Sequence, residues 1–241
     1  MEIEINGRRF TSETRFAFDL KPVLKNPEEL EENFPAYEMF RDVYFSEEDR
    51  ELILNKRLRY DYTFTNPGKI GDEFIKTFGH YHPEIGDGIT YPEIYEIIEG
   101  RAIFVLQKHG ESFGEIEDVV IVYAEEGDKI IIPPNYGHVM INPTDNMIKT
   151  ANWVCRDFSS IYDPYKQMRG GVYYYTINGW VKNERYNAPE PKFVKPKAPK
   201  EFKGSMYDLI KTDRLDFLVD PTQNMDLFEE VFEEIDHDLV K

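Results

Sequence analysis

Short segments in which apolar and polar residues alternate recur from residue 58 onward, and they restrict the folds that this chain can adopt. In the first segment, apolar or aromatic residues take every second position from Leu58 to Phe64, as in a β-strand with one buried face. Turn residues separate the segments, and one break, Asn178-Gly179, is the strongest short hairpin signal. Further strand-like segments cover residues 74–82, 93–99, 101–108, 119–124, 129–132, 137–142, 147–154 and 171–177. Many short strands with close turns predict a sandwich or barrel rather than a parallel α/β sheet.

The two ends of the chain do not share this pattern. Residues 26–32, Asn-Pro followed by glutamates, predict a short helix, and Ser46 is placed to cap a second one. Prolines interleaved with lysines beyond residue 188 predict an extended linker, and the helical spacing of apolar residues over 227–239 predicts an amphipathic helix. We therefore expect one structural domain in three segments: N-terminal strands and helices that pack on the barrel (1–57), the barrel itself (58–188), and the linker with the acidic helix (189–241).

The charge balance of the chain is strongly acidic: 29 Lys and Arg against 46 Asp and Glu give a net charge of −17. This charge repels phosphate backbones and anionic lipid surfaces, so it disfavours binding to nucleic acid or membranes. A small anionic substrate is still compatible, because a local pocket can oppose the global sign. The single cysteine, Cys155, cannot form an internal disulfide or a Cys-based zinc site. An acidic N-terminus, and an apolar run limited to residues 119–124 where a membrane span needs ~18, predict a cytoplasmic protein.

Three of the five histidines fall in two short strand-like segments. His80 and His82 are two positions apart, so on a strand both imidazoles point to the same face. His138 lies at the start of another predicted strand. Ten residues separate His82 from Glu93, which opens a further strand. Three imidazoles and one carboxylate on the inward faces of a small barrel would hold a divalent metal and leave coordination positions open. Iron, nickel, manganese and zinc all suit such a donor set.

Glycines and prolines stand at regular distances from these residues. Glu93 is followed after six residues by Gly100. A second block consists of Gly127, Pro133, Asn135, His138 and Asn142. Together the blocks resemble the two motifs of the cupin superfamily, with Asn135 where the family usually has glycine; asparagine also tolerates a left-handed turn. The resemblance implies a mainly β chain folded as a double-stranded β-helix, a jelly-roll barrel with a few peripheral helices.

The segment between His82 and Glu93 is longer than the few residues usual in cupins. The extra residues leave other carboxylates, those of Glu84, Asp87 and Glu96, as competitors for the ligand position. A regular strand turns Glu96 to the face opposite Glu93, so we favour Glu93.

A second resemblance is closer. Residues 66–74 contain Pro-Gly-Lys-x-Gly-x-Glu-Phe, residues 77–82 read Thr-Phe-Gly-His-Tyr-His, and residues 92–95 read Pro-Glu-Ile-Tyr. These runs resemble the cupin-type glucose-6-phosphate isomerases of archaea and some bacteria, over about residues 40–165. The resemblance implies a metal-dependent aldose–ketose isomerase of glycolysis and gluconeogenesis that interconverts glucose 6-phosphate and fructose 6-phosphate. It also implies a homodimer with one divalent ion per chain, Fe²⁺ ahead of Ni²⁺, Mn²⁺ or Zn²⁺.

The same resemblance implies roles for individual residues. The metal ligands are His80, His82, Glu93 and His138, and the catalytic residues are Glu93 and Tyr95. The substrate-binding residues are Thr63, Thr77 and Gly79 for the phosphate, with Tyr95 and Tyr162. Ser160 stands where the family has a histidine, so another group assists ring opening here or the substrate differs.

Other functions fit parts of the pattern. A related phosphosugar isomerase or epimerase would use the same site, and an Fe(II) cupin dioxygenase would use the same ligands with an apolar or organic-acid pocket. A metal-free cupin that acts as a sugar-binding module would usually have lost a ligand, whereas all four are present. Within the isomerase reading, Glu93 can shuttle a proton as base and acid, and an internal hydride shift is equally compatible.

Overall fold

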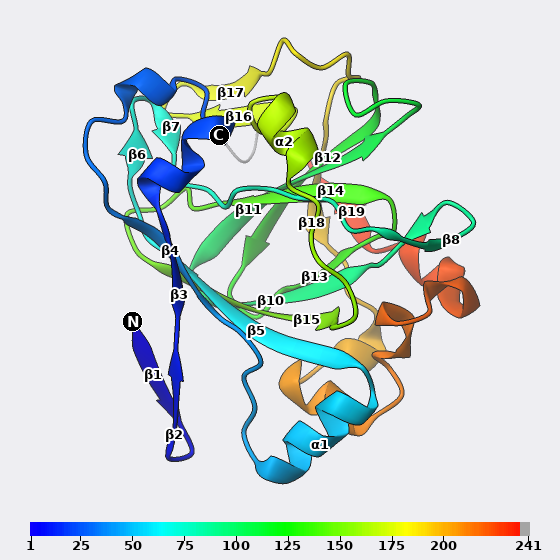
Figure 1. Ribbon diagram of the computed structural model, residues 1–241. Helices are drawn as coiled ribbons and strands as arrows, with labels where there is room; N and C mark the ends of the chain where they lie inside the picture. The colour runs from blue at the N-terminus through cyan, green and yellow to red at the C-terminus, as the bar shows by residue number, and fades with distance from the viewer. Residues whose placement is uncertain (237–241) are drawn as a thin grey trace.

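The computed structural model describes residues 1–236, which form mainly β-sheet (Figure 1). One large sheet has six strands, each antiparallel to its neighbours. In spatial order they are β13 (Lys129–Ile132), β10 (Glu93–Glu99), β15 (Ile148–Cys155), β5 (Leu58–Thr65), β4 (Pro35–Phe40) and β3 (Glu13–Phe16). The N-terminal segment thus adds β3 and β4 to the sheet that begins with the alternating strand β5.

The second large sheet faces the first (Figure 1). Its strands are β14 (Tyr136–Ile141), β11 (Arg101–His109), β12 (Ile116–Glu125), β18 (Lys192–Pro196) and β19 (Phe232–Glu234). Backbone bridges Lys76–Ile141 and His80–His138 place the segment after β7 beside β14. Two sheets that face each other in this way form the expected jelly-roll barrel, and the mainly β fold class is confirmed.

Smaller sheets and hairpins surround the barrel. They comprise a four-stranded sheet of β17 (Gly179–Lys182), β16 (Tyr173–Thr176), β7 (Glu73–Phe74) and β6 (Lys69–Ile70), and the hairpins β1 (Glu2–Ile5) with β2 (Arg8–Thr11) and β8 (Glu84–Gly86) with β9 (Ile89–Thr90). The turn between β16 and β17 is the predicted Asn178-Gly179 hairpin, in which Gly179 has φ 99°. Much of the predicted strand over residues 74–82 is irregular, because only isolated bridges pair it.

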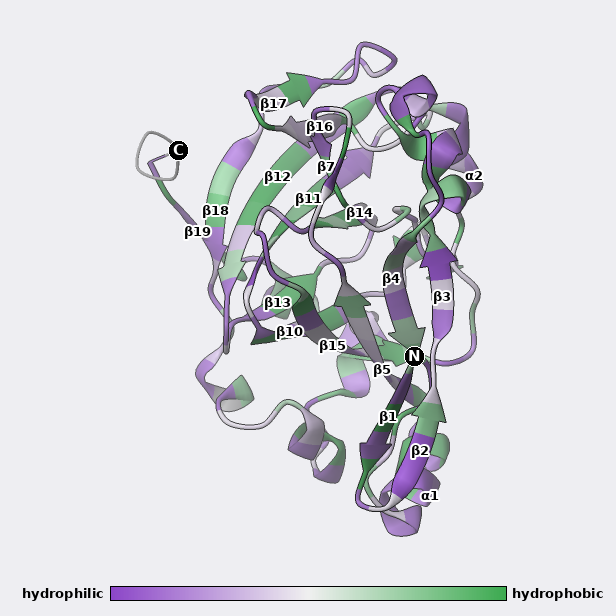
Figure 2. Ribbon diagram, turned by 90° about the vertical axis from the view of Figure 1, so that its left-hand side faces the viewer, coloured by the Kyte–Doolittle hydropathy of each residue, from purple (hydrophilic) through white to green (hydrophobic). Residues whose placement is uncertain are grey.

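Apolar side chains fill the space between the sheets and also cover the outer face of the six-stranded sheet. Between the sheets, Phe104, Val122 and Ile130 belong to one fully buried cluster. On the outer face, Trp153 packs with Tyr207 from the C-terminal segment, and its Nε1 donates to the Met206 carbonyl at 2.9 Å. Figure 2 shows the hydrophobic colouring concentrated on strands such as β11 and β12, with hydrophilic residues on the peripheral loops. The outer face of the six-stranded sheet is therefore closed by packing, and a cavity lies on its inner face.

Few residues are helical. The predicted second helix is α1 (Glu47–Asn55), whose N-cap Ser46 accepts a hydrogen bond from Asp49 N at 3.0 Å. The predicted first helix is a single 3₁₀ turn, η2 (Pro27–Glu29). The other helical segments are α2 (Asp163–Gln167), η1 (Ala17–Val23), η3 (Lys200–Phe202), η4 (Tyr207–Lys211), η5 (Asp216–Leu218) and η6 (Pro221–Phe228). Within residues 1–236, no helix has the length and apolarity that crossing a bilayer requires.

Two expectations for the C-terminal segment were wrong. The predicted linker contains β18, which pairs in parallel with β12, and the predicted amphipathic helix over 227–239 is η6 followed by β19. Strand β19 pairs with β18 and satisfies backbone groups that the edge of the sheet would otherwise expose, and this pairing outweighs the helical spacing. The end of the predicted helix, residues 237–239, lies outside the described residues.

Candidate active site

A cavity of about 310 Å³ opens on the inner face of the six-stranded sheet. Its walls come from β4, β5, β10, β14 and β15 together with residues 77–82 and 158–162. All of the site residues predicted from the sequence line it: Thr63, Thr77, Gly79, His80, His82, Glu93, Tyr95, His138 and Tyr162, with Ser160 beside them. Residues up to about 100 positions apart in the chain therefore share one chamber.

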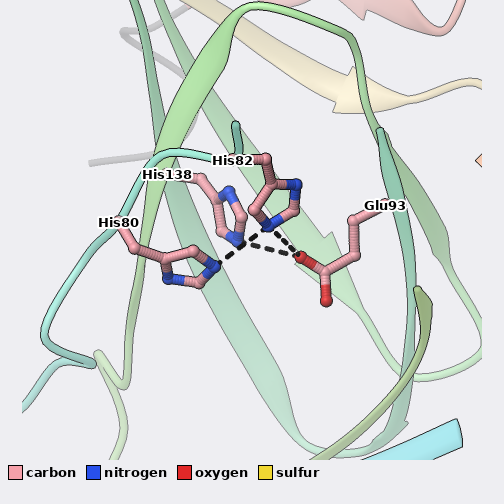
Figure 3. Close-up of side chains that lie close together, drawn as sticks. All are labelled: His80, His82, Glu93 and His138. Atoms are coloured by element: carbon pink, nitrogen blue, oxygen red, sulfur yellow. Dashed lines mark hydrogen bonds and ion pairs between the residues drawn. The ribbon is translucent and has the colours of Figure 1, made fainter. Parts of the chain in front are cut away.

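Four of these residues bring nitrogen and oxygen atoms together at one point. Possible ligand atoms of His80, His82, Glu93 and His138 all lie within 4.8 Å of one another. The Nε2 atoms of His80 and His82 are 3.1 Å apart, and Glu93 Oε2 is 3.3 Å from Nε2 of both His82 and His138. Figure 3 shows the three imidazoles and the carboxylate turned toward a common centre. Mutual backbone hydrogen bonds between His80 and His138, of 3.3 and 3.0 Å, fix their spacing.

Further contacts orient two members of this cluster. His82 Nδ1 lies 2.8 Å from the Tyr91 carbonyl, which only accepts, so Nδ1 donates and Nε2 keeps its lone pair toward the cluster. Asn152 Nδ2 donates to Glu93 Oε1 at 2.7 Å, which leaves Oε2 for the cluster. Neither Asn152 nor Tyr91 stood out in the sequence, because Asn152 meets Glu93 from 59 positions away and Tyr91 acts through its backbone carbonyl.

The electrostatics suit a cation at the centre of the cluster. Burial lowers the pKa of His80 well below its usual value and also lowers the pKa of His138, so both imidazoles are neutral. Burial alone would raise the pKa of the Glu93 carboxyl, but the imidazoles of His138 and His82 hold it well below its usual range. Glu93 Oε2 is buried with no hydrogen-bond partner in the described residues. Imidazole nitrogens together with one carboxylate oxygen that lacks a donor fit a divalent cation.

The carboxylates that competed with Glu93 lie elsewhere. Glu84 and Asp87 belong to the β8–β9 hairpin, which accounts for the extra length after His82. Glu96 pairs with Lys129 at 3.0 Å and is not part of the cluster.

A left-handed turn before His138 fastens the extra hairpin to the site. Asn135 has φ 72°, the conformation expected where the cupin pattern has glycine. Its Oδ1 accepts from Thr90 N at 3.0 Å, and its backbone N donates to Thr90 Oγ1 at 2.6 Å. The β8–β9 hairpin is therefore tied to the turn that carries His138.

The expected phosphate-binding residues are close to the cluster. Thr77 Oγ1 accepts from Met140 N at 3.0 Å, so its hydroxyl proton is free to donate into the cavity. Gly79 has φ 84°, and a Cβ there would meet Tyr165 and Val139 at 2.5 Å. Glycine is thus required at this position by packing as well as by backbone conformation.

Two arginines in the cavity wall, held by a buried aspartate behind it, were not identified from the sequence. Arg41 and Arg59 line the cavity, and both contact Asp61, which has no exposed surface. Arg41 Nη1 lies 2.8 Å from Asp61 Oδ2, and Arg59 Nε lies 2.8 and 3.0 Å from the two carboxylate oxygens. Part of this group could have been found from the sequence. Arg59, Asp61 and Thr63 take every second position of the first predicted strand, so they share one face.

Comparison with known proteins gives a consistent result. The family model described as glucose-6-phosphate isomerase matches residues 14–192. Glucose-6-phosphate isomerase of Thermococcus litoralis is 34% identical over 119 residues, covering 48% of this chain and 53% of that protein. The Thermococcus gammatolerans enzyme of the same name is 32% identical over 113 residues, covering 47% and 51%. The chain thus spans about half the length of these relatives.

A solved structure with similarity to this chain is oxalate decarboxylase from Bacillus subtilis. It has a TM-score of 0.38 and 14% sequence identity, over 52% of this chain and 27% of that one.

Proposed function

We propose, since the chain belongs to the glucose-6-phosphate isomerase family, that it interconverts glucose 6-phosphate and fructose 6-phosphate. The observation that carries this proposal is the meeting of three imidazoles and one carboxylate in the cavity that also holds the expected phosphate contacts. An aldose–ketose isomerase of sugar phosphates needs both features: a group of residues that acts on C1 and C2 of the sugar, and a separate site that binds the phosphate.

His80, His82, Glu93 and His138 would hold one divalent cation, with Fe²⁺ preferred and Ni²⁺, Mn²⁺ and Zn²⁺ accepted by the same donors. The buried Glu93 Oε2, which lacks a hydrogen-bond partner in the described residues, supports this assignment. Bound there, the cation supplies Lewis-acid polarisation of the carbonyl and hydroxyl oxygens at C1 and C2.

Glu93 is our candidate for the proton carrier. The hydrogen bond from Asn152 holds the carboxylate at Oε1, so the group has a fixed orientation toward the cluster. Glu93 would take the proton from C2 of the aldose and return it to C1. Tyr95, whose hydroxyl is 3.2 Å from His138 Nε2, would hydrogen-bond a sugar oxygen at the same end. Proton transfer through a carboxylate exchanges with solvent and a hydride shift does not, so deuterium uptake from ²H₂O separates the two routes.

The phosphate would lie at Thr63, Thr77 and Gly79, with Tyr162 along the sugar. Thr77 keeps a hydroxyl proton to donate, and Gly79 brings its backbone close to the cavity without a side chain. Since a sugar phosphate is a dianion that does not cross a bilayer unaided, we propose that the enzyme works in the cytoplasm, where its substrate is made.

We also propose that the enzyme is a homodimer. Phe16, at the end of the outermost strand β3, and Phe18 next to it are each 40% exposed. Exposed aromatic rings beside a sheet edge that carries no further strand within residues 1–236 favour contact with a second copy. Light scattering at micromolar concentration should give the mass of two chains, and the mass of one chain would contradict the proposal.

The test of the function is an isomerase assay on fructose 6-phosphate and mannose 6-phosphate, before and after chelation and with each metal added back. We expect metal-dependent turnover of fructose 6-phosphate. Faster turnover of mannose 6-phosphate would indicate a related phosphosugar isomerase instead. Oxygen uptake without sugar-phosphate turnover would indicate a dioxygenase, and a purified protein free of metal and of activity would indicate a binding module.

A further inference from the structure

Asp61 holds two arginine side chains in the wall of the cavity. It accepts hydrogen bonds from Arg41, from Arg59 and from the backbone N of Asp42, the last at 3.0 Å. One carboxylate between two guanidinium groups leaves the cluster with a net charge of +1. Burial alone would lower the pKa of Arg41, but the charge and hydrogen bond of Asp61 raise it above the usual value. Arg41 is therefore cationic throughout the pH range in which the protein is folded.

The cluster lies between the two ends of the proposed substrate site. On β5, Asp61 is two positions from Thr63. The pairing of β5 with β15 sets Asp61 opposite Asn152, the partner of Glu93. Strand β4 places Met39 opposite Thr63, two positions before Arg41. Arg41 is thus one side-chain row from the expected phosphate contact, and an arginine side chain is long enough to span that row.

Both guanidinium groups keep hydrogen-bond capacity. Arg59 contacts Asp61 through Nε, and its two terminal nitrogens have no protein acceptor within residues 1–236. Arg41 Nη2 is 3.2 Å from Met39 Sδ, and a thioether is a weak acceptor. These donors have only weak acceptors or none, so an anion entering the cavity would gain charge-assisted hydrogen bonds without displacing strong ones.

Arg41 and Arg59 are also the cationic side chains of the cavity wall among the described residues. The whole chain carries a net charge of −17, which opposes the approach of a dianion. Hydroxyl and amide donors at Thr63, Thr77 and Gly79 supply no positive charge. The two arginines beside them would supply the charge that neutralises the phosphate.

We propose that Arg41 and Arg59, positioned by Asp61, bind the phosphate of the sugar phosphate together with Thr63 and Thr77. The inference rests on the proposed function, which supplies the substrate, and names the groups that neutralise it. Asp61 is a positioning residue in this account, since it acts through the two arginines. Guanidinium forks match the oxygens of a phosphate in two parallel hydrogen bonds, which a lysine could not reproduce.

The test compares Arg41→Met with wild type in two measurements on the metal-loaded enzyme. The first is the kinetics of fructose 6-phosphate, and the second is the affinity for inorganic phosphate by titration calorimetry. Loss of a charge-assisted contact predicts a KM raised roughly tenfold to hundredfold with a smaller change in kcat, and phosphate affinity lowered by a similar factor. A fall in kcat with unchanged KM and unchanged phosphate affinity would overturn the proposal.

Two further variants control this test. Arg9→Met removes an arginine whose side chain is 75% exposed on β2, and it should change neither measurement. Arg41→Met leaves the buried Asp61 with less compensation, so the double variant Arg41→Met, Asp61→Asn removes both charges of that ion pair. If the single variant fails to fold, the double variant must show the raised KM and the weakened phosphate binding.

The outcomes for the inference and for the proposed function are distinguishable. A wild-type protein that lacks isomerase activity but binds inorganic phosphate in an Arg41-dependent way would reject the proposed function and support the inference. An active isomerase whose Arg41 variants keep wild-type KM and phosphate affinity would do the reverse.

Discussion

Thr63 and Thr77 face the same cavity, but their hydroxyl groups have different surroundings. The Thr77 hydroxyl accepts from Met140 N, whereas the Thr63 hydroxyl makes no hydrogen bond within residues 1–236. Thr63→Val should therefore leave folding intact and raise the KM for fructose 6-phosphate roughly tenfold to hundredfold, with a smaller change in kcat. Steady-state kinetics and a denaturant titration measure both effects. Unchanged kinetics would mean that the phosphate lies elsewhere.

The matched variant Thr77→Val should differ from Thr63→Val in stability. Removing the Thr77 hydroxyl takes an acceptor from the buried amide of Met140, which costs about 1–3 kcal/mol. A lowered denaturation midpoint together with a raised KM is the expected pair of results. Equal stability of the two variants would show that Met140 N finds another acceptor.

Glu93→Gln tests the proton carrier. The amide keeps the size of the side chain and its contact with Asn152, but it cannot accept a proton from carbon. We expect kcat to fall by roughly 10²–10⁴, the usual contribution of a general base, with a modest change in KM. Metal analysis of the same sample must show retained metal, because loss of the ion would lower kcat for a different reason. Full activity of a metal-loaded Glu93→Gln enzyme would exclude Glu93 as the base.

Residues with a local signal or a family motif were predictable from the sequence, and residues joined to their partners only by strand pairing were not. His80 and His82 lie two positions apart, so the two-residue period of a strand predicts that they act together. Arg41 is 20 residues from Asp61, and only the pairing of β4 with β5 brings them together. Asn152 likewise meets Glu93 through the pairing of β15 with β10.

At the scale of elements, the C-terminal segment acts as a cover for the outer face of the six-stranded sheet. Phe217 on η5 is 2% exposed and belongs to the same apolar cluster as Trp153. Phe217→Ala should lower the free energy of unfolding by about 3–5 kcal/mol, the usual cost of such a truncation. Because Phe217 lies on the opposite side of the sheet from the cavity, kcat below the unfolding transition should be unchanged. A denaturation midpoint equal to that of wild type would show that this cover contributes little.

The elements that the sequence predicted are those whose signals are local. The N-cap of α1 at Ser46 and the Asn178-Gly179 turn depend on a few neighbouring residues, and both are found. Strand β19 depends on a free edge of β18, a partner more than 30 positions away, so its helix-like spacing was misleading.

For the whole molecule, the candidate metal centre predicts a stability that depends on metal concentration. An ion bound to the folded chain alone stabilises it by about 2.7 kcal/mol at a free concentration one hundred times the Kd. Thermal denaturation should therefore show Tm rising with added Fe²⁺ or Mn²⁺ and falling after chelation. His138→Ala should abolish this response and the retention of metal. A wild-type Tm insensitive to chelation and to added metal would contradict the assignment of the four ligands.

The four candidate ligands come from a segment beside β14, from β14 itself and from β10 in the opposite sheet. A cation bound to all of them is a cross-link between the two sheets, joining chain positions from residue 80 to residue 138. Such a link can form only after both sheets have come together, late in folding. The effect of a bound ion would therefore be kinetic as well as thermodynamic: it would slow the opening of the barrel and leave the rate of its assembly nearly unchanged.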